Sequence, residues 1–127
     1  MSKNLKPTPQ ELGRILERKL HIELKKYFDE CLAGDNDIIK KFGNDVWGID
    51  HYAIKDKFVL LIQDKWQKDK PSIKTINHFI LSSQRIINYH NKEGVYIYLC
   101  LFISKTPLTK ASIDSLKSAN INNNYDM

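Results

Sequence analysis

Residues 48–66, GIDHYAIKDKFVLLIQDKW, contain two β-prone segments separated by a polar turn. The apolar run Phe58–Ile62 is typical of a buried strand. It continues without a turn into an amide, a carboxylate and an ammonium group, which belong to Gln63, Asp64 and Lys65. A buried strand that ends in three polar side chains raises the question of a site at the end of a sheet.

The two segments predict a β-hairpin. Its strands are expected over residues 46–54 and 57–66, with Asp56 and Lys57 at the tip. Pairing across such a short turn brings Asp50 opposite residues 62–64.

Strand alternation predicts which of these polar groups lie together. Side chains two apart on a strand share a face, so Gln63 and Lys65 are expected to project together. Asp64 and Trp66 are expected on the opposite face. Asp50 is then within reach of Gln63, and Asp64 points away from both.

Periodic apolar residues predict two helices that flank the hairpin in the sequence. The first covers residues 8–32, begins with a Thr-x-x-Glu capping box at Thr8 and stops at Gly34. The second covers residues 72–93 and stops at Gly94. Between the first helix and the hairpin, residues 35–46 are expected to form a loop with one helical turn.

The segment VYIYLCLFIS, residues 95–104, is apolar on both alternations and predicts a central strand. A short last helix is expected over residues 110–119, capped by Thr109. The order helix–strand–strand–helix–strand–helix predicts an α/β fold with a central mixed sheet flanked by helices. We expect one domain over residues 1–118 and a disordered polar tail over residues 119–127.

Composition sets the broad class of protein. The chain has 127 residues, 42% hydrophobic and 28% charged, which fits one soluble globular domain. No run approaches the roughly 18 apolar residues of a membrane span, and the polar start MSKNLKPTPQ predicts no secretory signal. Cys31 and Cys100 lack metal-like spacing and are expected to be buried free thiols in an intracellular protein, either cytoplasmic or nuclear. A net charge of +5 permits a polyanionic partner without requiring one.

The polar groups of the hairpin have a chemical use. The Asp50 carboxylate, the Gln63 amide oxygen and a nearby backbone carbonyl are hard ligands suited to Mg²⁺. Lys65 would hold the attacking water or offset charge on a phosphate. The residues alone fit a second interpretation equally well, in which Asp50 and Lys65 form a salt bridge at the rim of the sheet and Gln63 is solvated.

Two motifs resemble the PD-(D/E)xK, or restriction endonuclease-like, nuclease superfamily. GID is followed after twelve residues by QDK, with LLI ahead of it, as in the Mrr-like restriction endonucleases that carry Gln in place of the acidic residue. GRILERKL, with Gly13, Glu17 and Arg18, resembles the start of archaeal Holliday-junction resolvases. The predicted element order is also similar to the α–β–β–α–β core of this fold.

The resemblance implies a catalytic site made by four residues. Asp50 would be the metal-binding acid, Gln63 the second ligand, Lys65 the catalytic lysine and Glu17 a helix-borne acid that completes the metal site. Mg²⁺ or Mn²⁺ is the implied cofactor. Ile49 stands where the motif has Pro, and Gln63 removes a charge, which would weaken the affinity for a second metal ion.

Basic and polar residues near the motif in sequence offer contacts to nucleic acid. They either touch phosphates or form a solvated surface of a lysine-rich protein. The residues are Lys55, Lys57, Lys68, Lys70, Lys74, Arg85 and, through the resemblance, Gln84.

The expected function is that of a metal-dependent DNA endonuclease, restriction-type or junction-resolving, acting on duplex or branched DNA as a homodimer. The alternative is a catalytically weak or inactive relative that serves as a nucleic-acid-binding or assembly module.

No histidine has the spacing of a metal ligand, and His51 is expected to face away from Asp50. Trp47 and Trp66 are interpreted as core or rim aromatics and not as platforms on which bases stack.

Overall fold

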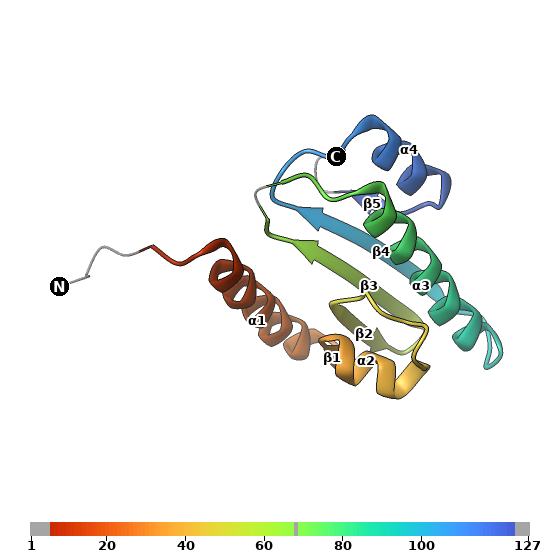
Figure 1. The fold of residues 1–127 in the computed structure, drawn as a ribbon. Coiled ribbons are helices and arrows are strands. Elements are labelled where there is room, and N and C mark those ends of the chain that lie inside the picture. Colours follow the sequence, from red (N-terminus) through yellow and green to blue (C-terminus); the bar gives the residue numbers. More distant parts are fainter. Residues whose placement is uncertain (1–5, 68, 124–127) are drawn as a thin grey trace.

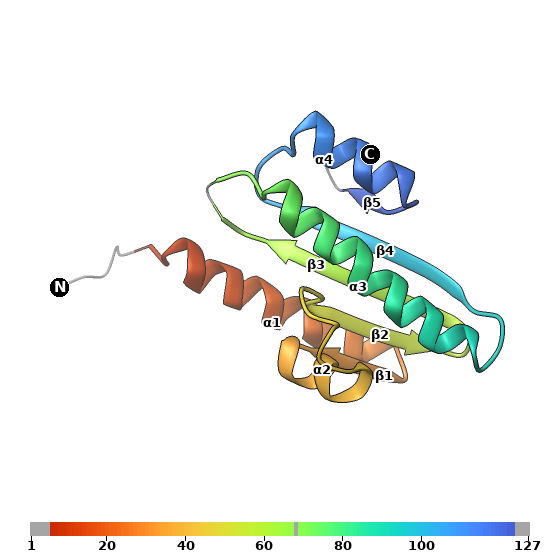
Figure 2. The same cartoon turned by 45° about the vertical axis from the view of Figure 1, so that its right-hand side comes forward.

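The computed structural model describes residues 6–67 and 69–123 of the chain. These residues form a mixed β-sheet with helices on both faces, which confirms the predicted α/β class (Figures 1 and 2). The elements are α1 (Pro9–Tyr27), β1 (Glu30–Ala33), α2 (Asp35–Phe42), β2 (His51–Lys55), β3 (Phe58–Lys65), α3 (Ile73–Asn91), β4 (Ile97–Ser104), α4 (Lys110–Ser118) and β5 (Asn122–Asn123).

The strands lie in the order β1-β2-β3-β4-β5. β2 pairs antiparallel with both β1 and β3, whereas β4 pairs in parallel with β3 and with the two-residue β5. The chain passes from β3 to β4 through α3, so the predicted βαβ crossover is confirmed. β4 has a neighbour on either side, although the partner at its outer edge is short.

The predicted hairpin forms between β2 and β3. Lys55 pairs with Phe58, which leaves Asp56 and Lys57 at the tip as expected. Asp56 has a φ of 53°, a left-handed conformation that aspartate tolerates better than most residues and that suits a tight hairpin turn. β2 is shorter than predicted, because it begins at His51 and the residues before it form a loop.

The first helix is also shorter than predicted, and the segment after it is a strand. Phe28 has extended backbone angles (φ −116°, ψ 150°), and the Asp29 N–H donates to the Ile54 carbonyl at 2.9 Å. The apolar spacing of Leu24, Phe28 and Cys31 fits a helix, but β1 satisfies the backbone groups at the free edge of β2. Long-range pairing therefore overrides the local periodicity.

Two further segments differ from the expectation. The predicted helical turn within residues 35–46 is a helix of 8 residues, α2. The tail predicted to begin at residue 119 continues in the fold as far as it is described, because Ile121 is buried in the core and residues 122–123 pair with β4. Residues 124–127 lie outside the described residues.

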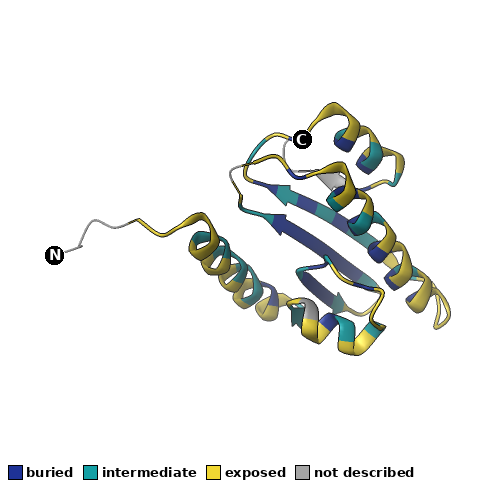
Figure 3. Cartoon of the chain, in the orientation of Figure 1, coloured by how far each residue is buried: buried dark blue, intermediate teal, exposed yellow. Residues whose placement is uncertain are grey.

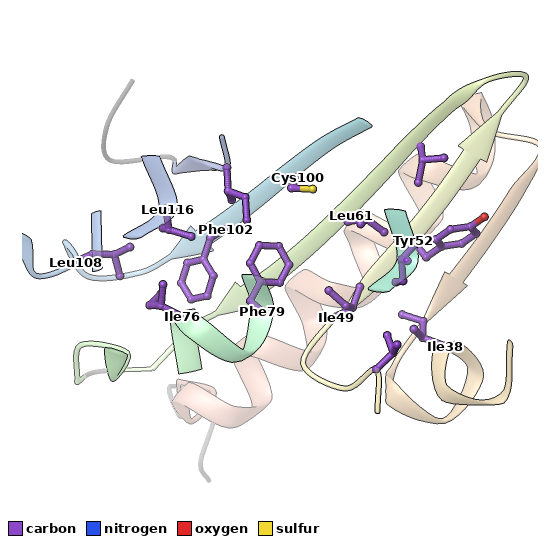
Figure 4. Close-up of a cluster of buried hydrophobic side chains, with 14 residues drawn as sticks. Ile38, Ile49, Tyr52, Leu61, Ile76, Phe79, Cys100, Phe102, Leu108 and Leu116 are labelled. Atoms are coloured by element: carbon purple, nitrogen blue, oxygen red, sulfur yellow. The ribbon is translucent and has the colours of Figure 1, made fainter. Parts of the chain in front are cut away.

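The sheet divides the core into two layers. On one face α2, α3 and α4 cover a large cluster in which Phe79 and Phe102 pack edge to face at 5.7 Å (Figure 4). On the other face α1 contributes Leu24 to a smaller cluster with Ala53, Leu60 and Ile62. The strands are accordingly mostly buried and the outer sides of the helices exposed (Figure 3). The described helices include none that is long and apolar enough to span a membrane.

Only one of the two thiols is fully buried. Cys100 lies in the larger cluster, whereas Cys31 on β1 is half-buried beside the smaller one. Both are free, as predicted.

Candidate metal centre

Three carboxylates meet where β3 ends beneath the first half of α1. They belong to Glu17 on α1, Asp50 just before β2 and Asp64 on β3, and one oxygen atom from each lies within 4.8 Å of the other two. We call these three residues the acidic cluster. Glu17 and Asp50 were predicted to share a site, whereas Asp64 was predicted to point away from it.

Asp50 is positioned by β3. Its N–H donates to the Ile62 carbonyl at 2.8 Å, and its Oδ2 accepts from the Asp64 backbone N–H at 2.7 Å. This confirms that Asp50 lies opposite residues 62–64. The pairing of β2 with β3 ends at His51, which lies opposite Ile62. Beyond Ile62, β3 therefore has no paired strand residue on the β2 side. The Asp50 side chain fills that position, which brings its carboxylate to Asp64.

Asp64 faces α1, which corrects the prediction. Alternation along β3 puts Asp64 on the same face as Ile62, and Ile62 packs with Leu24 of α1. Glu17 lies on the same helix, so this face, and not the Gln63 face, contains the carboxylates. Leu60 and Ile62 share this face of β3. Assigning the first helix to the face of these two residues would have predicted that Asp64 faces it.

A buried histidine holds Asp64 in place. His51 Nε2 lies 3.0 Å from Asp64 Oδ2, and both side chains are only 1% exposed. The other carboxylate oxygen, Asp64 Oδ1, is buried and accepts from no N–H group. The Asp64 side chain also lies within hydrogen-bonding reach of the Glu17 carboxyl group. His51 therefore contacts the acidic cluster, although alternation predicted that it would face away from Asp50. The contact arises because Asp64, and not Asp50 alone, lies at the centre of the site.

Gln63 points to the opposite side of the sheet. Alternation gives it the face of Leu61, which is covered by α3. Its amide nitrogen lies 3.7 Å from the position that a Cβ on Gly48 would occupy, and Gly48 has a φ of +85°. Asp64, and not Gln63, therefore lies beside Glu17 and Asp50. Of the three ligands that the resemblance implies, Glu17 and Asp50 lie together and Gln63 lies apart from them.

Lys65, the last residue of β3, is half-buried and lines a cavity together with Glu17 and Asp64. Its positive charge lowers the pKa of both Glu17 and Asp50 against the larger effects described next. Within the described part of the chain, Lys65 and Asp50 form no ion pair, so the simple rim salt bridge does not account for these residues.

Burial and mutual repulsion raise the pKa of two of the carboxyl groups. Burial, a side-chain hydrogen bond with Asp64 and the charges of Asp64 and Asp50 together raise the pKa of Glu17 to about 8. Burial and the Asp64 charge raise the pKa of Asp50 to about 7, against the opposing Asp64 backbone N–H, Lys65 and His51. Carboxyl groups packed this closely are costly to ionise together without a compensating positive charge.

The donor set fits a divalent metal ion. Carboxylate oxygens are hard ligands of the kind that Mg²⁺ and Mn²⁺ prefer. Asp64 Oδ1 is a buried acceptor without an N–H donor, and the Glu17 carboxyl group can donate to Asp64 only while Glu17 is protonated. A buried oxygen of this kind normally has a partner, and a cation would provide one while also relieving the repulsion.

Two cavities flank the acidic cluster along α1. The larger, which we call the Trp66 cavity, has a volume of about 580 Å³ and lies between the start of α1 and the end of β3. The smaller, about 300 Å³, lies between α1 and the start of β2 and is lined by His21 and Asp50. Arg14 and Glu17 line both. The acidic cluster is therefore reached from two sides of one helix.

The residues predicted to contact nucleic acid do not all lie near this site. Lys55 and Lys57 are at the hairpin tip, roughly 20 Å along β3 from Asp64 at about 3.3 Å per residue. Lys70 precedes α3 and Lys74 is in its first turn, so both lie at the end of the sheet where the acidic cluster is.

Two of the predicted contacts make bonds within the fold. Arg85 donates to the Asp45 carbonyl at 2.7 Å, and Gln84 donates to Asn88 at 3.2 Å. Lys68 lies outside the described residues.

His51→Ala is expected to lower the free energy of unfolding by roughly 2–4 kcal/mol, because it removes a buried hydrogen bond to a charged group and leaves a cavity. It should also weaken Mn²⁺ binding, since Asp64 loses the contact that orients it. His90→Ala is the matched control, because His90 is equally buried and its Nε2 contacts the Tyr52 hydroxyl at 2.8 Å. Denaturant unfolding and Mn²⁺ titration should show that both variants lose stability and only His51→Ala loses metal affinity.

Comparison with protein-family models, with curated proteins and with solved structures found no match for this chain.

Proposed function

We propose that the protein is a metal-dependent endodeoxyribonuclease whose site is formed by Glu17, Asp50, Asp64 and Lys65. The observation that carries this proposal is the acidic cluster, in which one oxygen from each of three carboxylates lies within 4.8 Å of the others and the buried Asp64 Oδ1 has no N–H donor. The GID and GRILERKL motifs support the nuclease class, because two residues of the cluster, Glu17 and Asp50, come from them. Asp64 takes the ligand position that the resemblance gave to Gln63.

The three carboxylates would hold Mg²⁺ or Mn²⁺. Such an ion, when bound, supplies positive charge to a phosphodiester oxygen and lowers the pKa of a coordinated water. In the hydrolysis, water oxygen bonds to phosphorus and one P–O ester bond breaks. The proton lost by the water is balanced by the one that the departing alcohol gains.

The chain's own groups have separate roles in this reaction. His51 fixes the Asp64 carboxylate through Oδ2 and leaves Oδ1 available. Lys65, beside Glu17 and Asp64, places an ammonium group where negative charge develops on the phosphate. Arg14 lines both cavities beside the acidic cluster and is suited to bind neighbouring phosphates.

The partner that fits this site is DNA, duplex or branched. Phosphate contacts made by Arg14, Arg18 and Lys70 would orient it without reading its sequence. Cutting both strands of a duplex, or two arms of a junction, requires two such sites, so we propose that the protein acts as a homodimer.

Cleavage of end-labelled DNA tests the proposal directly. Duplex, single-stranded and four-way-junction DNA are incubated with the wild-type protein in Mg²⁺, in Mn²⁺ and in excess EDTA. We expect endonucleolytic products with either metal and none with EDTA. Lys65→Ala should lower the rate on the order of 10²–10³-fold, whereas the exposed Lys19→Ala on α1 should leave it unchanged.

Binding without cleavage would contradict the nuclease proposal. DNA binding that is salt-sensitive, persists in EDTA and is never followed by product formation would instead support the alternative, a module that binds nucleic acid without cutting it.

A further inference from the structure

We propose that the Trp66 cavity binds one nucleotide of an unpaired DNA strand, next to the phosphate held at the acidic cluster. The inference rests on the proposed nuclease function and specifies its substrate. It would make the enzyme selective for DNA with a single-stranded segment, such as an end, a flap or a branch point.

The first argument is the size and place of the cavity. Its volume of about 580 Å³ is in the range of cavities that enclose small organic ligands. Glu17 and Asp64 form part of its wall, so a nucleotide inside it would be directly adjacent to the acidic cluster. A cavity of this size next to a catalytic centre fits a neighbouring unit of the same strand.

The second argument is the chemistry of the lining. Trp66 contributes an aromatic surface to the wall of the cavity. Gln10 and Gln67 add amide groups that can donate to and accept from a base, and Arg14 and Lys65 add positive charge for a phosphate. An aromatic ring, mixed hydrogen-bonding groups and two cations match the three parts of a nucleotide.

The third argument separates an unpaired strand from a duplex. In a duplex the faces of each base are stacked and the Watson–Crick edge is paired, so a protein reaches only groove edges and phosphates. A recess lined by the Trp66 indole and by amide groups offers contacts to groups that a duplex conceals. Only a base taken out of the stack, or one that was never paired, can use them.

Gly13 keeps the cavity open. It lies in the interior of α1, and a Cβ placed on it would be 3.5 Å from Trp66 Cβ, an ordinary contact distance. A larger side chain would therefore extend into the space between α1 and Trp66. Because glycine has a low helix propensity, replacing it with leucine is not expected to destabilise α1 through its intrinsic helix propensity.

Trp66 fluorescence tests the inference without cleavage. The chain has two tryptophans, so the full-length Trp47→Phe protein reports on Trp66 alone. It is titrated in EDTA with a short oligodeoxythymidylate and with a blunt duplex of the same length. We expect the single strand to change Trp66 emission and to bind at least about 10-fold more tightly than the duplex.

Two variants in the same background locate the binding. Gly13→Leu should weaken single-strand binding by about 10-fold or more by filling the cavity, with unchanged Mn²⁺ binding as proof that the site is intact. Arg14→Gln should weaken it by a similar factor, whereas Lys19→Gln, the same charge change on the same helix, should not.

The result that overturns the inference is distinct from failure of the nuclease proposal. If Trp66 emission does not respond, or if Gly13→Leu binds the single strand as tightly as the parent, the cavity is not a nucleotide site even when the protein cleaves DNA. If the protein never cleaves but Trp66 responds and both cavity variants lose affinity, the nucleotide site stands and the nuclease proposal fails.

Discussion

Asp64→Asn is expected to lower the rate of Mg²⁺-dependent DNA cleavage by at least roughly 10³-fold. The substitution keeps the shape of the side chain but removes its negative charge and one of its two acceptor oxygens, both of which a metal ion requires. The rate is measured under single-turnover conditions with saturating protein, so that a change in DNA binding does not disguise the effect.

Gln63→Ala is the matched comparison, because it alters the neighbouring residue on the opposite face of the same strand. It should remain within about 10-fold of the wild-type rate while losing stability, since Gln63 is 3% exposed and fills space beside Gly48. The reverse result, an inactive Gln63→Ala and an active Asp64→Asn, would show that the resemblance assigned the second ligand correctly and that the acidic cluster is not the site.

The metal-free protein is expected to lose stability as the pH rises from about 5 to 8. The pKa of Asp50 is raised to about 7 and that of Glu17 to about 8, both above their values in the unfolded chain. Groups with raised pKa values stabilise the fold fully below the unfolded pKa, and this contribution is lost as the pH rises through the folded pKa. Asp50 should account for a loss on the order of 2 kcal/mol, with a smaller part from the more exposed Glu17.

Denaturant unfolding in EDTA at several pH values measures this dependence. Asp50→Asn should flatten it, because the amide does not titrate, whereas Asp45→Asn, an exposed acid in the preceding loop, should leave the slope unchanged. Saturating Mn²⁺ should reverse the trend, since metal binding requires the deprotonated carboxylates. An unchanged slope in Asp50→Asn would show that Asp50 is not the main source of the pH dependence.

The hairpin could be predicted from the sequence because local signals agreed with the fold. The apolar run in β3 and the polar tip at Asp56 placed both strands and brought Asp50 opposite residues 62–64, as observed. The βαβ crossover likewise followed from a helix between two apolar strands. These features depend on segments that are close together in the sequence, and the apolar periodicity of each segment predicts its secondary structure.

The strand β1 could not be predicted from the sequence, because its local pattern disagrees with the fold. Leu24, Phe28 and Cys31 continue the helical spacing of α1, and nothing local marks the change at Phe28. The strand forms because β2 presents an unpaired edge, which is a property of the assembled sheet. Where an apolar spacing permits either a helix or a strand, tertiary contacts determine which of the two forms.

The candidate site was predicted in part. The residues contributed by the two motifs, Glu17 and Asp50, do meet. The choice between Gln63 and Asp64 depended on which face of β3 lies under α1, and alternation alone gives two faces without saying which helix covers each. His51 was missed for the same reason, because its role depends on Asp64.

Calorimetric titration of the wild-type protein with Mn²⁺, in two buffers with different ionisation enthalpies, measures the central claim most directly. At pH 7 we expect saturable binding that releases protons, because Asp50 and Glu17 give up theirs to bind the ion. In Asp64→Asn the affinity should fall by at least about 100-fold, while Gln63→Ala should bind as the wild type does. Wild-type binding that releases no protons, or equal affinity in Asp64→Asn, would contradict the assignment of Glu17, Asp50 and Asp64 as a metal site.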